Sequence, residues 1–303
     1  MNRYWPLLIV LASVWGASYL FIKVAVDGGF EPAPLMCARA TIAAAVLLGY
    51  LAITMGARRA ASELRDSWRQ WLALGAVANA LPFWLVAWGE KHVDSGIAAI
   101  AQSTVPLFTV LLGLRFLPHE PLSRGQVLGF ALGLLGVGVL AGAHPDGGWW
   151  AVAGTLAVVL SSLAYATGSV IGQRSVSGTP GPVLAAGAMA GAAVTLVPFA
   201  ILQAPTSAPD ADAILSLLAL ALLGTAFAQL VLYRMLNLFG ARRLSLVTYL
   251  MPGFALAYGA VLLDEPITVA ALGGLALILA GVALGSGAVR RQARRAPVGA
   301  VTP

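Results

Sequence analysis

Apolar residues recur along the sequence in runs of about 20, and short polar segments separate one run from the next. An α-helix rises 1.5 Å per residue, so a run of this length crosses the ~30 Å hydrocarbon core of a bilayer. The pattern therefore predicts an all-α polytopic membrane protein. It places ten transmembrane helices at residues 5–25, 33–54, 70–89, 95–114, 126–142, 149–171, 182–202, 213–233, 245–263 and 267–285.

The sequence contains an internal repeat. Residues 95–142 are echoed by residues 241–285, and each copy has a mid-helix proline, a Glu-Pro pair and a glycine-rich last helix. The corresponding positions are Pro106 with Pro252, and Glu120-Pro121 with Glu265-Pro266. The repeat indicates that two similar units make up most of the chain.

We place the two units at residues 5–142 and 149–285, with five predicted helices in each. Residues 290–303 form a basic tail that we expect to be disordered. Because each unit crosses the membrane an odd number of times, the second unit is inverted relative to the first. Inverted repeats are typical of secondary transporters, which bind substrate near the membrane midplane between the repeats.

Composition supports a membrane protein. Charged residues make up 10% of the chain and apolar residues 59%, against roughly 25% and 45–50% in soluble domains. The mean hydropathy is +0.87. Cys37 is the only cysteine, which excludes an intramolecular disulfide.

The positive charges indicate the orientation. If the N-terminus is cytoplasmic, the inner side receives all of the 18 Lys and Arg residues except Lys23, Arg39 and Lys91. This bias follows the positive-inside rule, so we expect both termini in the cytoplasm and the protein in the cell (inner) membrane. The arginines lie in short loops, which argues against nucleic-acid binding. We expect Arg39 at the outer end of its helix, snorkelling to the interface, and contact with a substrate carboxylate is the alternative interpretation.

Several of these features resemble a known family. Trp15-Gly16 in the first helix, Pro106, the Glu120-Pro121 turn and the glycine-rich last helices are similar to paired EamA domains of the drug/metabolite transporter superfamily. The resemblance covers about residues 5–285, and within the superfamily it is greatest to YddG-type exporters of amino acids. It implies a transporter of small molecules with a central cavity between its halves.

Polar side chains are costly at bilayer depth and should face a cavity or another helix. The first, third, fourth, sixth, eighth and ninth helices carry almost all of them, so we expect these six to line the cavity. The second and seventh helices carry only Thr41 and Thr195 deep inside, and the fifth and tenth are almost purely apolar. We expect these four helices to face lipid or to act as scaffold.

Helical spacing and side-chain chemistry select the candidate substrate-binding residues. Amides and hydroxyls bind ammonium and carboxylate groups without a buried charge, and aromatic rings offer apolar and cation–π surfaces. The candidates are Trp15, Ser18, Tyr19, Asn79, Trp84, Gln102, Tyr165, Gln229 and Tyr249. The structural alternatives stay open: hydroxyls also bond carbonyls of their own helix, and Trp84 suits a lipid interface.

Three prolines are candidate hinges. Pro82, Pro106 and Pro252 each remove a helical hydrogen bond, which produces a kink. Gating is the functional interpretation of these kinks, and a static bend that shapes the cavity is the alternative.

The acidic residues and histidines indicate no catalytic site. We interpret Glu120 and Glu265 as residues at helix starts, and we expect no carboxylate deep in the membrane. His92, His119 and His144 lie in loops without the Asp, Cys or Glu neighbours of a metal site. No catalytic constellation or phosphate-binding loop is visible. We therefore expect no enzyme activity, metal or cofactor.

The combined prediction is a secondary transporter that exports neutral or aromatic amino acids by alternating access, as a monomer or homodimer among membrane lipids. Proton antiport and facilitated export both stay open. A multidrug or other metabolite exporter is the alternative within the superfamily. A nucleotide-sugar transporter would favour cationic residues in the cavity, and we expect none at its centre. A membrane sensor or scaffold is the alternative of another class.

Overall fold

The computed structural model describes residues 3–116, 124–142, 148–175, 179–204, 207–239, 244 and 246–293. In these ranges every regular element is a helix, which confirms the expected all-α class. The elements are α1 (Tyr4–Asp27), α2 (Pro32–Met55), α3 (Ala57–Asp66), α4 (Trp68–Gly75), the π-helical η1 (Ala76–Ala80), α5 (Leu81–Glu90), α6 (Ser95–Gln102), α7 (Val105–Phe116), α8 (Arg124–Ala141), α9 (Gly148–Ser175), α10 (Gly181–Leu202), α11 (Ala211–Ala221), the π-helical η2 (Leu222–Phe227), α12 (Ala228–Phe239), α14 (Val247–Leu262) and α15 (Val269–Ala293).

Eight stretches of the described chain are long and apolar enough to cross a membrane as helices. Two shorter apolar helices, Val247–Leu262 and Val269–Leu284, follow them. Each of these ten stretches overlaps one helix expected from the sequence. Helices suit such apolar runs because, in lipid, a backbone must satisfy its own hydrogen bonds.

Two expected boundaries were wrong. The stretch after the second span was expected to be a loop, but it forms α3, which buries Ala60 and exposes its arginines. α15 continues to Ala293, so residues 290–293 of the expected tail are helical. Alanine and arginine are strong helix formers, which explains both extensions. Residues 294–303 of the tail lie outside the described residues.

Three of the long spans are not uniform α-helices. η1 lies between α4 and α5, and η2 lies between α11 and α12. The fourth span is interrupted at Ser103 and Thr104, between α6 and α7. π-helical turns and helix breaks free backbone carbonyls, and such irregularities are frequent at functional sites. All three interruptions lie near the middle of their spans.

The expected hinge prolines lie in different settings. Pro82 is the second residue of α5, which follows η1, and Pro106 is the second residue of α7, which follows the break at Ser103 and Thr104. Pro252 lies inside the continuous helix α14. The role of these prolines in gating remains a prediction.

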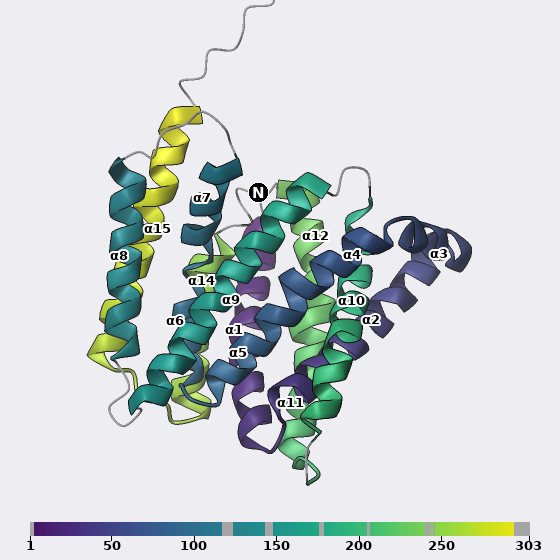
Figure 1. Cartoon of the computed structure of the whole chain (residues 1–303), viewed down its shortest axis with the longest axis horizontal. Helices are drawn as coiled ribbons and strands as arrows, with labels where there is room; N and C mark the ends of the chain where they lie inside the picture. The colour runs from purple at the N-terminus through teal and green to yellow at the C-terminus, as the bar shows by residue number, and fades with distance from the viewer. Residues whose placement is uncertain are drawn as a thin grey trace, which may run out of the picture.

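Helix contacts between the two halves of the chain are reciprocal. α1 packs against α11 and α14 of the second half, and α9 packs against α5, α6 and α7 of the first. The first span of each half thus contacts the third and fourth spans of the other. α2 packs against α10, and α8 packs against α15. Figure 1 shows α8 and α15 at one edge of the bundle and α2, α3 and α10 at the opposite edge.

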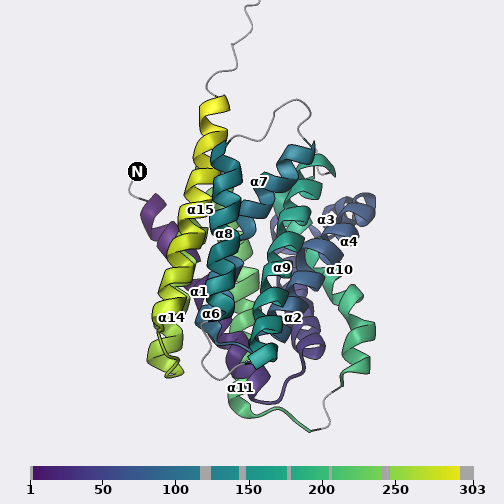
Figure 2. The ribbon, with the colours of Figure 1, turned by 60° about the vertical axis from the view of Figure 1, so that its left-hand side comes forward.

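Glycines allow α8 and α15 to approach closely, as expected from the sequence. A Cβ on Gly136 would lie 2.8 Å from the carbonyl oxygen of Gly274. A Cβ on Gly281 would collide with the carbonyl oxygen of Gly129. Gly129 and Gly136 are followed 145 positions later by Gly274 and Gly281, the same spacing as between Glu120 and Glu265. The two contacts are therefore copies of each other, and we call them the glycine seam. Figure 2 shows the two helices side by side along their length.

Glu265 was expected to stabilise the start of its own helix, but it caps a helix of the other half. Its carboxylate accepts hydrogen bonds from the backbone N–H of Ser95 (2.7 Å) and of Gly96 (3.1 Å), and from the Ser95 hydroxyl (2.8 Å). These are the free N–H groups of the first turn of α6, where a negative charge is favourable. Glu120, Pro121 and His119 lie outside the described residues, as does His144.

Candidate functional site

A cavity of about 290 Å³ lies between the two halves of the chain. It is lined by residues of seven spans, including all six spans selected from the sequence. The lining residues are Trp15, Ser18, Tyr19, Ile22, Arg39, Asn79, Phe83, Val86, Gln102, Val105, Tyr165, Ser169, Gly224, Thr225, Gln229, Thr248 and Met251. Helices α8, α10 and α15 contribute no described residue to this lining, as expected of scaffold.

Most of the candidate substrate-binding residues lie at the cavity. Those that line it are Trp15, Ser18, Tyr19, Asn79, Gln102, Tyr165 and Gln229. The structure brings them together from α1, η1, α6, α9 and α12.

Trp84 and Tyr249 are not among the described residues that line the cavity, so their expected positions were wrong. Both are half-buried and pack against the hydrophobic core. Successive residues on a helix are turned by about 100°. On α5 the cavity face therefore belongs to Phe83 and Val86, and beside Tyr249 it belongs to Thr248 and Met251. Pro82, Pro106 and Pro252 are each next to a lining residue but do not line the cavity themselves.

Arg39 was expected at the outer interface, but it is buried and lines the cavity. Its Nε donates a hydrogen bond to the Thr225 hydroxyl (2.8 Å), and its Cζ lies 3.9 Å from the centre of the Phe83 ring. None of the ion pairs in the described part of the chain involves Arg39. The second span, expected to be scaffold, thus supplies a cation to the cavity.

The depth of Arg39 could have been read from the sequence. α2 begins at Pro32, and seven residues at 1.5 Å each place Arg39 about 10 Å inside the helix. That is deep for a side chain that snorkels to the interface. The sequence does not indicate which residue Arg39 contacts, because its partner Thr225 is 186 residues away in the sequence.

The two π-helical segments each place one polar residue at the cavity. Asn79 Nδ2 donates to the carbonyl of Leu74 (3.2 Å), and the Thr225 hydroxyl donates to the carbonyl of Leu220 (2.9 Å). In both cases the acceptor is five residues earlier, which is the spacing of a π-turn. Each segment therefore uses a polar side chain to stabilise its own irregularity and also presents that side chain to the cavity.

Two glutamines bring hydrogen-bonding atoms that have no partner in the described structure. Gln102 Oε1 accepts from the Ser161 hydroxyl (2.7 Å), whereas its Nε2 is buried without an acceptor. Gln229 Oε1 is buried without a donor. Buried polar atoms are nearly always hydrogen-bonded, so an unpaired donor and an unpaired acceptor at a cavity are suited to a ligand.

Some of the lining hydroxyls instead fit the structural alternative. Ser18 donates to the carbonyl of Val14 (3.1 Å), and Ser169 donates to that of Tyr165 (3.0 Å). These are bonds within their own helices. For these two serines, a structural role within the helix accounts for the hydroxyl.

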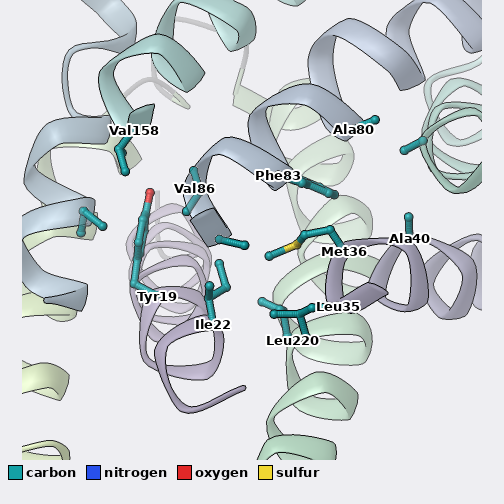
Figure 3. Close-up of a cluster of buried hydrophobic side chains, with 14 of the residues drawn as sticks. Tyr19, Ile22, Leu35, Met36, Ala40, Ala80, Phe83, Val86, Val158 and Leu220 are labelled. Atoms are coloured by element: carbon teal, nitrogen blue, oxygen red, sulfur yellow. The ribbon is translucent and has the colours of Figure 1, made fainter. Parts of the chain in front are cut away.

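The apolar part of the lining continues into the hydrophobic core. Figure 3 shows Tyr19 of α1, Met36 of α2, and Phe83 and Val86 of α5 gathered in one cluster. The described lining contains one cation, no carboxylate, and several aromatic rings. Such a site can bind a small molecule that has a negative group and an apolar part, and it holds no pair of groups for acid–base chemistry.

The family model named "EamA-like transporter family" matches the chain at residues 3–142 and 152–287. A protein of Archaeoglobus fulgidus, named only as a transporter of uncharacterized activity, is 27% identical over 92% of this chain and 97% of its own length. A probable amino-acid metabolite efflux pump of Salmonella typhimurium is 26% identical over 95% and 97%. A probable terminal-alkyne amino-acid exporter of Streptantibioticus cattleyicolor is 33% identical over 45% and 44%.

A solved crystal structure, titled only as that of a protein, has the same fold. It superposes with a TM-score of 0.67 at 24% identity and covers 96% of this chain and 99% of its own. Both halves of the chain, each with five of the apolar helices, match the family model. The chain is therefore a multi-pass membrane protein that belongs to the EamA-like transporter family, with two EamA domains, and it is a transporter rather than an enzyme.

Proposed function

We propose that this protein exports small amino acids or closely related carboxylate-bearing metabolites across the cell (inner) membrane by alternating access. Full-length relatives named as amino-acid metabolite efflux pumps support this substrate class. Aromatic and other neutral amino acids, as in the YddG-type exporters that the sequence resembles, fit the aromatic lining best.

The proposal includes ten spans arranged as two inverted repeats with both termini in the cytoplasm. The reciprocal contacts between the halves support it, because two units related by a two-fold axis produce such pairs. The start of α1 and the end of α15 also lie at the same end of the bundle (Figure 1). The excess of arginine in loops on that side supports its cytoplasmic orientation.

The observation that carries the substrate assignment is Arg39. A buried guanidinium without a carboxylate partner is costly unless a ligand supplies the negative charge. A substrate carboxylate can pair with it and can also accept from Gln102 Nε2, while Gln229 Oε1 can accept from an ammonium group. The aromatic lining then accommodates the apolar side chain.

The charge and the size of the cavity weigh against the rival substrates. An uncompensated cation repels the cationic drugs that multidrug exporters carry. A nucleotide sugar has a bulky diphosphate group, whereas this cavity measures about 290 Å³ and holds one described cation.

Counterflow in proteoliposomes tests the proposal with three matched compounds: phenylalanine, phenethylamine, which lacks the carboxylate, and 3-phenylpropionate, which lacks the amine. We expect wild-type protein to exchange phenylalanine and to reject phenethylamine. Hydrogen bonds to charged groups contribute about 1.5–3 kcal/mol, so Arg39→Gln should reduce phenylalanine exchange by roughly tenfold or more.

Arg59→Gln is the matched control, because Arg59 lies on α3 with its side chain 68% exposed. We expect it to transport like wild type. Equal exchange of phenethylamine and phenylalanine by both the wild type and Arg39→Gln would contradict the proposal and favour a multidrug exporter. Preference for 3-phenylpropionate over phenylalanine would redirect it to organic acids.

A further inference from the structure

Glu90 is a buried acid that the proposed binding site does not use. It is the last residue of α5, it is 0% exposed, and neither of its carboxylate oxygens has a hydrogen-bond partner in the described structure. It follows the cavity residue Val86 by four positions, so both lie on the same face of α5. A carboxyl group thus lies one helical turn beyond the cavity, where the sequence indicated none.

α5 and α9 pack tightly beside Glu90. A Cβ on Gly89 would lie 2.9 Å from the carbonyl oxygen of Gly154, and a Cβ on Gly154 would lie 2.9 Å from that of Gly89. The two backbones are therefore in contact beside Glu90. Separation of α5 from α9 would expose the carboxyl group to water on the outer side.

The charged groups that act electrostatically on Glu90 are Lys23, Asp27, Arg39 and Glu265. Lys23 Nζ donates to the backbone carbonyl of Glu90 (3.0 Å) and to Asp27 (3.2 Å) rather than to the Glu90 carboxylate. Glu265 caps α6, and Arg39 is held by Thr225.

The neighbours on its own segment are Lys91, His92 and Asp94. Lys91 pairs with Glu31 at 2.9 Å, and His92 stacks on Trp150. In the described structure, neither Lys91 nor His92 forms a hydrogen bond or an ion pair with the Glu90 carboxylate. Among the charged groups, Lys23 and Arg39 favour a negative charge on Glu90, whereas Glu265 and Asp27 disfavour one.

An ionised carboxylate without a donor is very unfavourable in such a place, and a bound proton removes the charge. We propose that Glu90 is the proton-binding site that couples export to the proton gradient. The inference rests on the export function proposed above, since coupling requires a substrate that moves outward.

The proposed cycle is balanced with a proton as the only co-reactant. When the outer side opens, one proton from outside binds the Glu90 carboxylate and gives the carboxylic acid, and the substrate leaves. When the inner side opens, the acid releases this proton to the cytoplasm. The ammonium group of an incoming substrate then compensates the charge of the ionised carboxylate. One proton moves inward for each substrate that moves outward.

Glu90→Gln tests the site, because the amide has nearly the shape of the protonated acid. In proteoliposomes with an imposed pH gradient, we expect wild type to accumulate phenylalanine against its gradient and Glu90→Gln to lose this accumulation to background. Counterflow at equal pH needs no net proton movement and should persist in the variant. Glu63→Gln is the matched control, since Glu63 lies on α3 and its carboxylate pairs with the exposed Arg59. It should keep the response.

A second measurement is independent of substrate. The infrared C=O band of a protonated carboxyl group should be present in wild type and absent in Glu90→Gln. If Glu90→Gln does not yield folded protein, Glu90→Asp should keep both the band and the response to the gradient, because it retains the acid.

Each result decides one of the two proposals. A pH-gradient response in Glu90→Gln equal to that of wild type, or none in wild type that performs counterflow, would overturn the coupling role. Identical infrared bands in wild type and Glu90→Gln would overturn proton binding. Absence of counterflow with every amino acid would instead contradict the proposed export function, while loss of the infrared band would still support Glu90 as a proton site.

Discussion

The glycine seam between α8 and α15 and the central cavity use the two halves of the chain in different ways. At the seam the halves make the same contact twice, Gly136 against Gly274 and Gly281 against Gly129. At the cavity both halves contribute a π-helical segment with a side chain bonded five residues back, but the side chains are Asn79 in one and Thr225 in the other.

The second and seventh spans show the asymmetry of the cavity most clearly. Both begin with a Pro-X-Pro sequence, at Pro32 and Pro180, and counting from these starts places Gly187 where the first half has Arg39. A Cβ on Gly187 would lie 2.6 Å from the Trp71 ring, so that position has no room for a side chain. At this position the first half supplies a cation to the cavity, whereas the second half packs closely against Trp71.

The difference has a physical reason. Helices in lipid associate through close packing, which two copies of one unit satisfy equally well. An amino acid carries a carboxylate at one end and an apolar group at the other, so a cavity that recognises it needs different groups on its two sides. We infer that the seam preserves the two-fold relation while the cavity departs from it.

The largest effect is expected from breaking the seam. Gly136→Ala and Gly281→Ala each place a methyl group against a backbone carbonyl, and overpacking of this kind costs about 1–3 kcal/mol. Both should lower the thermal unfolding temperature in detergent by similar amounts, because their contacts are copies. Gly138→Ala is the control, since its Cβ would meet nothing within 4 Å. If both variants unfold at the same temperature as Gly138→Ala, the close contacts of the glycine seam do not stabilise the protein.

Glu265→Ala is expected to have the next largest effect on stability. It removes three hydrogen bonds from the first turn of α6, and loss of a helix cap costs about 0.5–2 kcal/mol. Thermal unfolding measures this loss. Glu31→Ala serves as the control, because Glu31 makes an exposed ion pair with Lys91, and such pairs contribute little. Equal unfolding temperatures for the two variants would mean that the cap does not stabilise the contact between the halves.

Thr225→Val tests whether the Thr225 hydroxyl, which also bonds the Leu220 carbonyl, positions Arg39 for substrate binding. It leaves Arg39 Nε without its acceptor and should weaken phenylalanine binding by about tenfold, ~1.4 kcal/mol. Thr225→Ser should restore binding. Thr41→Val is the control, since Thr41 lies on the same helix as Arg39 and its hydroxyl bonds the Cys37 carbonyl on an exposed face. Concentration dependence of counterflow gives the affinity, and an unchanged value in Thr225→Val would show that Arg39 needs no positioning.

Asn79→Thr should have the smallest effect. The substitution gives η1 a hydroxyl donor like the one in η2. Thr225 shows that such a hydroxyl reaches the carbonyl five residues earlier. Stability should change by less than about 0.5–1.5 kcal/mol, the net value of one hydrogen bond. Asn79→Leu, which removes the donor, should unfold at a lower temperature than Asn79→Thr. The reverse order would show that Asn79 does not stabilise η1.

Much of the cavity lining could be predicted because polar residues are rare in these spans. Gln102, Asn79 and Gln229 stand out in apolar helices, and helical spacing places Trp15, Ser18 and Tyr19 on one face. The structure brings these six to the cavity. Trp84 was misplaced because an aromatic residue carries no signal of the face it occupies when its neighbour Phe83 is equally apolar.

By itself, the sequence determined the apolar helices, the repeat and the spans that carry polar groups. Each of these follows from the order of residues along one helix, since lipid excludes unsatisfied backbone and tolerates few polar side chains. Only the tertiary structure decided what Arg39, Glu265 and Glu90 contact. Arg39 meets Thr225 and Glu265 meets Ser95, at separations of 186 and 170 residues, while the Glu90 carboxylate has no hydrogen-bond partner in the described structure. The same side chain snorkels, caps a helix or binds a ligand according to its surroundings, and those surroundings come from distant helices.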